Sequence, residues 1–163
     1  MKKILILNTG GTFNKIYNPL NGVLEIDKNA SALLNIANKW LCDFEILNII
    51  NKDSLEMTSK DRLELLDTIT HSKYTHIIIV HGTDTMDISA SFLAEERLEK
   101  HIVFTGAMVP YSIDPVEATA NLASAYGYIQ ALNRHGIYIA MNRAMGSYDM
   151  VLKDRKQGKF TIV

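Results

Sequence analysis

Residues 75–86 read THIIIVHGTDTM, and the pattern of this stretch underlies the fold prediction. An unbroken apolar run, Thr75–Val80, passes directly into a polar segment, His81–Met86. Strands without alternating polar residues are usually covered on both faces, as in parallel sheets. The stretch therefore predicts a buried parallel strand whose carboxyl end opens into a loop rich in glycine and hydroxyl groups.

The same combination of apolar runs and amphipathic segments recurs on both sides of this stretch. Four further apolar runs predict strands at Lys3–Asn8, Phe44–Ile50, His101–Thr105 and Gly136–Met141. Helical periodicity predicts helices at Ala30–Leu41, Ser59–His71, Asp87–Lys100 and Val116–Arg134. This alternation implies a doubly wound, mostly parallel α/β sheet with helices on both faces. Because ligands in such sheets bind at the carboxyl ends of the strands, we expect the chemistry in the loops that follow them.

Composition points to one compact domain over residues 1–163 that acts on a small molecule. Hydrophobic residues make up 47% of the chain, and a net charge of −1 gives no basic surface for nucleic acid or anionic lipid. No apolar stretch is long enough to cross a membrane. The single cysteine, Cys42, allows no internal disulfide and is expected to be a buried structural thiol. We therefore predict a cytoplasmic protein with neither nucleic-acid nor membrane partners.

The loop after the first predicted strand reads NTGGT, residues 8–12. Its two glycines permit a tight turn that exposes backbone N–H groups to an incoming oxygen. A phosphate-binding turn is the alternative interpretation, but it requires a third glycine and an immediate helix. Residues 13–22 are instead polar and contain Pro19 and Gly22, which favours a mobile loop and a site that does not bind nucleotides.

The loop His81–Met86 supplies more hydroxyl and carboxylate groups than a helix N-cap needs. A threonine beside an aspartate at a helix N-terminus also suits anion recognition. The next loop, Thr105–Pro110, contains small residues but no acid or base, and we interpret it as a structural wall. The histidines lack metal-ligand spacing and are interpreted as packing or solvated residues: His71, His76, His81, His101 and His135.

Taken together, these loops resemble the bacterial asparaginase/glutaminase family. The segments NTGGT (8–12), HGTDTM (81–86) and TGAMVP (105–110) match its motifs in order and spacing. Two further segments agree: DSLEMT (53–58) resembles the family's substrate-binding serine loop, and the segment from Met141 to Lys153 resembles the one that ends in its catalytic lysine. The resemblance implies the fold of the family's N-terminal domain, which is Rossmann- or flavodoxin-like.

The resemblance also implies catalytic roles. Thr12 is expected to be the nucleophile that attacks the side-chain amide of asparagine, glutamine or a related small amide, with an acyl-threonine intermediate and release of ammonia. Tyr17 is expected to lie near Thr12 and help to activate it, and Thr83, Asp84 and Lys153 are expected to form a second triad. Either Tyr17 or Lys153 acting through Thr83 is the base for Thr12. No metal or cofactor is expected.

Substrate binding is assigned by the same resemblance. Ser54 and Asp84 are expected to hold the α-carboxylate and the α-amine of the substrate. The backbone N–H groups of Gly11 and Thr83 are expected to form the oxyanion hole.

The chain departs from the family pattern at several points. Family members are longer, and the C-terminal domain that completes a neighbouring subunit's site is expected to be absent here. Val109 replaces an arginine, and Tyr17 fits its role only with a shortened loop, because Pro19 occupies the aligned position. Three interpretations remain: an active amidohydrolase, a weak or inactive amino-acid-binding relative, and the amidase subunit of a larger amidotransferase. We also expect a homo-oligomer, a dimer or higher, through the helix Val116–Arg134.

Overall fold

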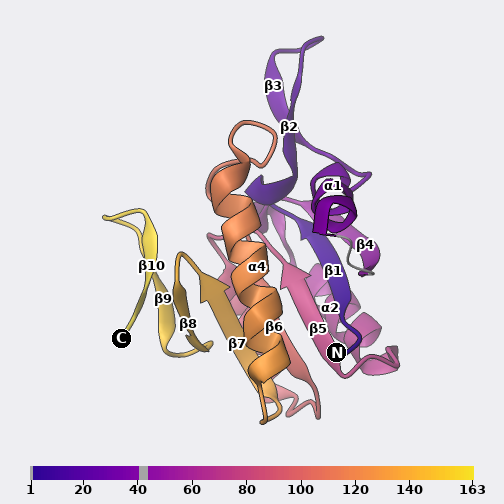
Figure 1. The fold of residues 1–163 in the computed structure, drawn as a ribbon, viewed down its shortest axis with the longest axis vertical. Helices are drawn as coiled ribbons and strands as arrows, with labels where there is room; N and C mark the ends of the chain where they lie inside the picture. The colour runs from indigo at the N-terminus through magenta and orange to yellow at the C-terminus, as the bar shows by residue number, and fades with distance from the viewer. Residues whose placement is uncertain (1, 41–43) are drawn as a thin grey trace.

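The computed structural model describes residues 2–40 and 44–163, so the expectation for Cys42 lies outside the described residues. Its centre is a six-stranded sheet in the order β4-β1-β5-β6-β7-β8, parallel except for the antiparallel pair β7–β8 (Figure 1). The strands are β1 (Leu5–Gly10), β4 (Glu45–Lys52), β5 (His76–Val80), β6 (His101–Thr105), β7 (Gly136–Met141) and β8 (Ala144–Ser147). The predicted strands are confirmed, each within two residues of its expected bounds.

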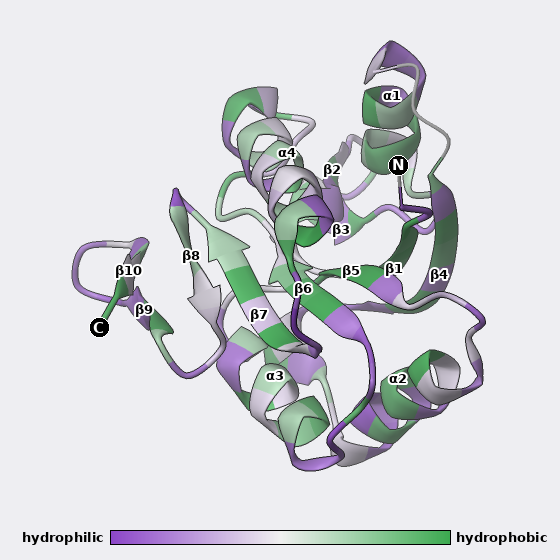
Figure 2. Cartoon of the chain, turned by 60° about the horizontal axis from the view of Figure 1, so that its bottom comes forward, coloured by the Kyte–Doolittle hydropathy of each residue, from purple (hydrophilic) through white to green (hydrophobic). Residues whose placement is uncertain are grey.

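Helices cover both faces of the sheet, as Figure 2 shows. Helices α1 (Ser31–Trp40) and α4 (Pro115–Ala131) pack on one face, and α2 (Ser59–His71) and α3 (Met86–Glu95) pack on the other. Each face buries its own apolar cluster, so the doubly wound α/β arrangement is confirmed.

Strand β5 shows why its apolar run is unbroken. Ile77 and Ile79 pack against α2 and α3, whereas Ile78 and Val80 pack against α1 and α4. Successive side chains of a strand point to opposite faces, and both faces are covered here.

The strand order determines where a ligand can bind. If the five parallel strands are numbered 1 to 5 along the chain, their order across the sheet is 2-1-3-4-5, which is flavodoxin-like. The first strand, β1, and the third, β5, are therefore neighbours. The chain leaves β1 towards one edge of the sheet and leaves β5 towards the other. The loops after β1 and β5 therefore diverge at the topological switch point, where α/β sheets bind ligands.

The ends of the helices follow local chemistry. A capping box starts α2, with Thr58 and Asp61 each bonded to the other's backbone N–H. Helix α4 begins one residue earlier than predicted, because Asp114 caps it and Pro115 occupies its first position. Helix α3 ends at Glu95 rather than Lys100, since Arg97 adopts a left-handed φ of 49° that ends the helix.

Residues 13–22 are not the irregular loop that the sequence predicted, and whether the segment is mobile stays a prediction. After a short 3-10 helix, η1 (Thr12–Asn14), the chain forms a β-hairpin of β2 (Lys15–Asn18) and β3 (Val23–Ile26) that projects from the sheet (Figure 1). Gly22, at φ 75°, closes the turn by donating its N–H to the Asn18 carbonyl at 2.8 Å. A four-residue turn ending in glycine is a hairpin signal that the polar composition of the segment concealed.

A second hairpin lies near the carboxyl end of the chain, formed by β9 (Val151–Asp154) and β10 (Lys159–Ile162). It packs beside β8, and Val151 and Phe160 are buried in the core shared with α2 and α3. In the described part of the chain, no helix is both long and apolar enough to cross a membrane.

Candidate active site

The turn after β1 is held by buried amide side chains. Asn14 donates to the Asn8 side-chain oxygen at 2.8 Å and to the Gly10 carbonyl at 2.7 Å. Asn8 donates in turn to Asn14 at 3.1 Å and to Asn48 on β4 at 2.9 Å. Because buried amides are costly unless paired, this network fixes the direction in which the chain leaves β1.

Glycines bring the turn after β1 against the turn after β5. A Cβ added to Gly11 would lie 2.5 Å from the backbone nitrogen of Gly82. The loop after β6 approaches in the same way, since a Cβ added to Gly106 would lie 2.3 Å from the His81 carbonyl oxygen. Such distances are far inside van der Waals contact, so these backbones approach closely only because side chains are absent. Thr12 and Thr83 directly follow Gly11 and Gly82, so the contact places both threonines at the switch point.

The Gly11 N–H is already engaged within the fold. It donates to the Lys52 carbonyl on β4 at 3.0 Å, and its expected place in the oxyanion hole stays a prediction. The β1–β4 register shifts between Asn8 and Gly10, and this irregularity turns the Gly11 N–H towards β4. The backbone N–H groups of Thr12 and Thr83, by contrast, have no hydrogen-bond acceptor among the described residues.

Ser54 joins the site from the loop after β4. It opens the short helix η2 (Ser54–Glu56), where Asp53 and Glu56 form a capping box. The Ser54 hydroxyl accepts the Asp84 N–H at 3.2 Å, and its carbonyl accepts the Thr85 hydroxyl at 2.8 Å. Its side chain lies against Gly82, so that a Cβ on this glycine would meet the Ser54 Cβ at 2.7 Å. The expected serine therefore lies beside the expected Thr–Asp pair.

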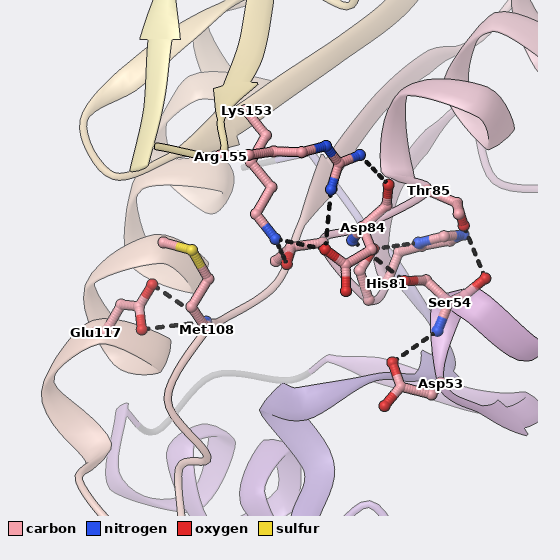
Figure 3. A network of polar contacts seen from close by, with 11 residues as sticks. Asp53, Ser54, His81, Asp84, Thr85, Met108, Glu117, Lys153 and Arg155 are labelled. Carbon is pink, nitrogen blue, oxygen red and sulfur yellow. Dashed lines mark hydrogen bonds and ion pairs between the residues drawn. The ribbon is translucent and has the colours of Figure 1, made fainter. Parts of the chain in front are cut away.

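Lys153 completes the second group, as Figure 3 shows. Its Nζ donates to the Thr83 hydroxyl at 2.8 Å and to Asp84 Oδ1 at 2.7 Å. The lysine side chain is only 16% exposed, so the pair is shielded from much of the solvent. The hydrogen bond from Lys153, opposed by partial burial, holds the pKa of Asp84 below its ordinary value.

Arg155 is a member of the site that the sequence did not identify. Its guanidinium donates to Asp84 Oδ1 at 3.1 Å and to the Asp84 backbone carbonyl at 2.9 Å. Arg155 lies in the turn that directly follows β9, outside any strand, so no local periodicity in the sequence marked it.

A buried network supports the Asp84 loop from behind. His81 donates from Nδ1 to the Gly82 carbonyl at 2.7 Å and accepts the Ser89 hydroxyl on Nε2 at 2.8 Å, a tautomer assigned from these partners. Ser89 accepts from Arg62 at 3.0 Å, and Arg62 also donates to the Thr85 hydroxyl at 3.3 Å. Burial lowers the pKa of His81 to about 4, so its ring is neutral at pH 7. Its interpretation as a packing histidine is supported, with the added role of orienting this loop.

The loop after β6 is anchored by an acid that the sequence analysis missed. Glu117, in the first turn of α4, accepts the backbone N–H of Met108 at 3.1 Å (Figure 3) and that of Val109 at 2.9 Å. Asn142, after β7, donates to the other oxygen of Glu117 at 3.1 Å. These contacts fix the position of the loop relative to α4, and its role as a structural wall stays a prediction.

Tyr17 lies on the β2 strand of the projecting hairpin and is 61% exposed. Its hydroxyl is directed at the hairpin turn, 3.9 Å from where a Cβ of Gly22 would lie. Within the described ranges, no hydrogen bond connects Thr12 to Tyr17. The role of Tyr17 stays a prediction.

Three histidines gather at the opposite, amino end of the sheet. The rings of His76 and His101 stack with centroids 4.4 Å apart, and His135 meets His101 edge-on at 4.7 Å. No group of three His, Cys, Asp or Glu side chains among residues 2–40 and 44–163 is arranged to hold a metal ion.

Comparisons with known proteins agree with this geometry. A family model described as asparaginase, N-terminal, matches residues 3–157, a range that contains every site residue named above. The chain is 29% identical over 164 residues to L-asparaginase 1 of Escherichia coli (strain K12), which covers 94% of this chain and 45% of that protein. It is 28% identical over 160 residues to one of the subunits of the glutamyl-tRNA(Gln) amidotransferase of Thermoplasma volcanium, covering 93% of this chain and 38% of that one.

A solved structure of the thermostable L-asparaginase from Thermococcus kodakarensis superposes with a TM-score of 0.83 at 25% identity. The superposition covers 99% of this chain and 51% of that one. The chain thus spans about half the length, or less, of the proteins that it matches here.

Proposed function

This chain belongs to the asparaginase family, and from that premise we propose that it hydrolyses the side-chain amide of asparagine, or of a related small amide such as glutamine, to the acid and ammonia. The observation that carries the proposal is the contact of Lys153 with Thr83 and Asp84, next to the glycine turn that presents Thr12. These groups come from loops far apart in the chain and meet at the switch point of the sheet.

The proposed reaction begins at Thr12. A neutral hydroxyl is a poor nucleophile, so Thr12 must transfer its proton to a base as its oxygen attacks the amide carbon. In the proposed relay, the Thr12 proton passes to the Thr83 oxygen as the Thr83 proton passes to Lys153 Nζ, 2.8 Å away, so Lys153 must release its own proton before the attack. Tyr17 is the alternative base and reaches Thr12 only if the hairpin moves.

The attack places negative charge on the former carbonyl oxygen. We propose that the backbone N–H groups of Thr12 and Thr83 stabilise this oxyanion, because each lacks an acceptor within the described residues and each follows a glycine of the contact. Removing one such donor elsewhere costs about 10²–10³ in rate. Ammonia then leaves, and water hydrolyses the acyl-threonine to regenerate Thr12.

Recognition of the substrate backbone is assigned to Ser54 and Asp84. The Ser54 hydroxyl accepts the Asp84 N–H, so its own proton can be donated to the substrate α-carboxylate. Asp84 Oδ2 has no partner among the described residues and is the acceptor for the α-ammonium (Figure 3). The similarity to an amidotransferase component supports a second candidate, an amidase that delivers ammonia within a larger complex.

We further propose a cytoplasmic homo-oligomer, a dimer or higher. The single cysteine fits a reducing compartment. Analytical ultracentrifugation at micromolar concentration checks the assembly, and a monomeric mass contradicts it.

Ammonia release from a panel of amides tests the proposed activity. The panel contains asparagine, glutamine and succinamate, which is asparagine without its α-amine. Thr12→Ala is expected to abolish release from every substrate of the wild type, whereas Thr12→Ser, which keeps a hydroxyl, retains measurable turnover. Wild-type turnover that survives in Thr12→Ala rejects the nucleophile, and a wild type inactive on the whole panel rejects the amidohydrolase.

A further inference from the structure

Arg62 is a charged residue at a core-facing position of α2. It is 9% exposed and shares its helix face with Leu65 and Ile69, three and seven positions later, which pack in the core. Packing alone favours an apolar side chain at such a position. No carboxylate pairs with Arg62 among residues 2–40 and 44–163. Because a buried charge without a partner charge is costly, its presence indicates a role beyond the packing of the helix.

Three neutral oxygens from three separate segments accept hydrogen bonds from this guanidinium. Nε donates to the Ser89 hydroxyl on α3 at 3.0 Å, and Nη1 donates to the Met57 carbonyl, directly after η2, at 3.3 Å. Nη2 donates to the Thr85 hydroxyl at 3.3 Å. The donors of a guanidinium form a fixed fork, so one side chain reaches all three oxygens at once, which a lysine ammonium does not. Arg62 thus cross-links the loop after β4, the loop after β5 and α3.

One arm of the cross-link lies directly behind the two residues that are proposed to hold the substrate. The Thr85 hydroxyl accepts from Arg62 and donates to the Ser54 carbonyl at 2.8 Å (Figure 3). Thr85 follows Asp84 in the chain, and the Asp84 N–H donates to the Ser54 hydroxyl at 3.2 Å. The contact between Ser54 and Asp84 is therefore supported from behind by Arg62.

The other arm holds the same loop on the amino-terminal side of Asp84. The Ser89 hydroxyl accepts from Arg62 and donates to the His81 ring at 2.8 Å, and this ring in turn donates to the Gly82 carbonyl at 2.7 Å. Ser89 and His81 are fully buried, so these hydrogen bonds do not compete with solvent. The Asp84 loop is thus held on both sides of Asp84 by contacts that meet at one guanidinium.

We propose that Arg62 is a positioning residue that fixes the spacing between Ser54 and Asp84. This inference rests on the proposed function, in which Ser54 holds the substrate α-carboxylate and Asp84 holds the α-ammonium. Both groups are attached to one carbon atom, so a ligand gains from both contacts only where their spacing is preorganised. Arg62 contacts neither Thr83 nor Lys153, so its loss acts on substrate binding and not on the chemical step.

Hydrogen exchange measured by NMR tests the cross-link without an assay of activity. The Asp84 N–H reports local opening between the two loops, whereas the Ile78 N–H, in the central strand β5, reports global unfolding. Arg62→Met keeps the length of the side chain and suits a core position. Its Asp84 exchange is expected to be about tenfold faster relative to Ile78, as expected for loss of hydrogen bonds from a charged group. Equal acceleration at both sites, or none at Asp84, overturns the positioning role.

Calorimetric titration with aspartate and with succinate tests the effect on recognition. Aspartate carries both α-groups, whereas succinate lacks the ammonium and gains nothing from the spacing to Asp84. In Arg62→Met, the Kd for aspartate relative to that for succinate is expected to rise about threefold to tenfold, because preorganisation is lost. An unchanged ratio overturns the recognition role, and so does a wild type that binds neither ligand at millimolar concentration.

Two further variants separate the cross-link from general damage to α2. Leu65→Met changes the packing of the same buried helix face and should leave both ratios at their wild-type values. Arg62→Lys keeps the charge without the fork and should lie between the wild type and Arg62→Met in both ratios. It also carries the test if Arg62→Met does not fold. A shifted ratio in Leu65→Met, or wild-type ratios in Arg62→Lys, overturns the cross-link.

The outcome for the proposed function is read separately. Shifted exchange and binding ratios in a protein that releases no ammonia from any amide reject the hydrolase and leave the positioning role of Arg62 standing. Ammonia release with both ratios unshifted in Arg62→Met does the reverse.

Discussion

Gly11 and Gly82 are in backbone contact, so close that a Cβ on Gly11 would lie 2.5 Å from the Gly82 nitrogen. Each glycine is followed directly by a threonine, Thr12 or Thr83. The separation of the two hydroxyl groups is therefore set by a contact that contains no side chain.

Gly11→Ala is expected to disrupt this contact. The new methyl group would overlap Gly82, and the φ of 73° at Gly11 is unfavourable for alanine. Overlap costs about 1–3 kcal/mol beyond the strain of the left-handed backbone. Urea titration should thus show a larger loss of unfolding free energy than Gly158→Ala, where φ is 61° but the space is open. Equal losses in the two variants would mean that the turns are not in contact in solution.

Lys153→Met is expected to lower kcat for the best amide by about 10²–10⁴, the usual contribution of a positioned proton-transfer group. The variant keeps the length of the side chain but loses the contacts with Thr83 and Asp84. Lys156→Met serves as the matched control, because Lys156 is exposed on the same hairpin. A kcat that stays within threefold of the wild type would remove Lys153 from the chemical step.

Asp84→Asn is expected to raise KM for asparagine by about tenfold, corresponding to ~1.4 kcal/mol for a lost charge-assisted hydrogen bond. The change also leaves Lys153 and Arg155 without their carboxylate, so KM for succinamate should fall or stay constant. Asp149→Asn, at an exposed position, provides the same charge change away from the site. Parallel increases in KM for both amides would count against contact between Asp84 and the α-ammonium.

Stability is expected to fall between pH 6.5 and pH 4 because of His81. Its pKa is about 4 in the folded protein, against 6.5 in the unfolded chain, so the unfolded state binds the proton first as the pH falls. The stabilisation from keeping this ring neutral is complete above pH 6.5 and is lost on acidification, by roughly 3 kcal/mol in total. Burial also lowers the pKa of His76 and His101, which adds to the loss in the same direction.

Urea midpoints measured from pH 7.5 to pH 4 check this dependence. His81→Asn, which keeps a donor near Nδ1, should flatten the curve, whereas His71→Gln, at an exposed position, should not. The same slope in the wild type and in His81→Asn would assign the loss to other groups.

Much of the fold could be predicted from local pattern. Strands β1, β5, β6 and β7 were visible as apolar runs, because a strand covered on both faces has no polar face to interrupt the run. The edge strand β4 is buried at only one of its residues and was visible from its apolar residues in spite of Glu45 and Asn48. The capping box of Thr58 and Asp61 was visible because its spacing is local. The hairpin of β2 and β3 was missed, since its signal is a turn that ends at Gly22 rather than an apolar run.

The candidate site was predicted in part. The resemblance named Thr12, Ser54, Thr83, Asp84 and Lys153, and the structure brings the last four together by direct hydrogen bonds. Arg155 and Glu117 were missed, because each is recognised only by the loop it contacts. The hydrogen bond from the Gly11 N–H to the Lys52 carbonyl could not be predicted, because Lys52 lies on a strand that is distant in sequence.

The amino-acid order therefore established the succession of strands and helices and the residue types at the strand ends, because burial period and capping act over a few neighbouring residues. It could not establish that the N–H groups of Thr12 and Thr83 lack acceptors among the described residues, or that Lys153 and Arg155 both contact Asp84 Oδ1. Nor could it establish where the Tyr17 hydroxyl points. Those properties arise from backbone contacts and charge balances between loops that are remote in sequence, and they exist only when the sheet has brought the loops together.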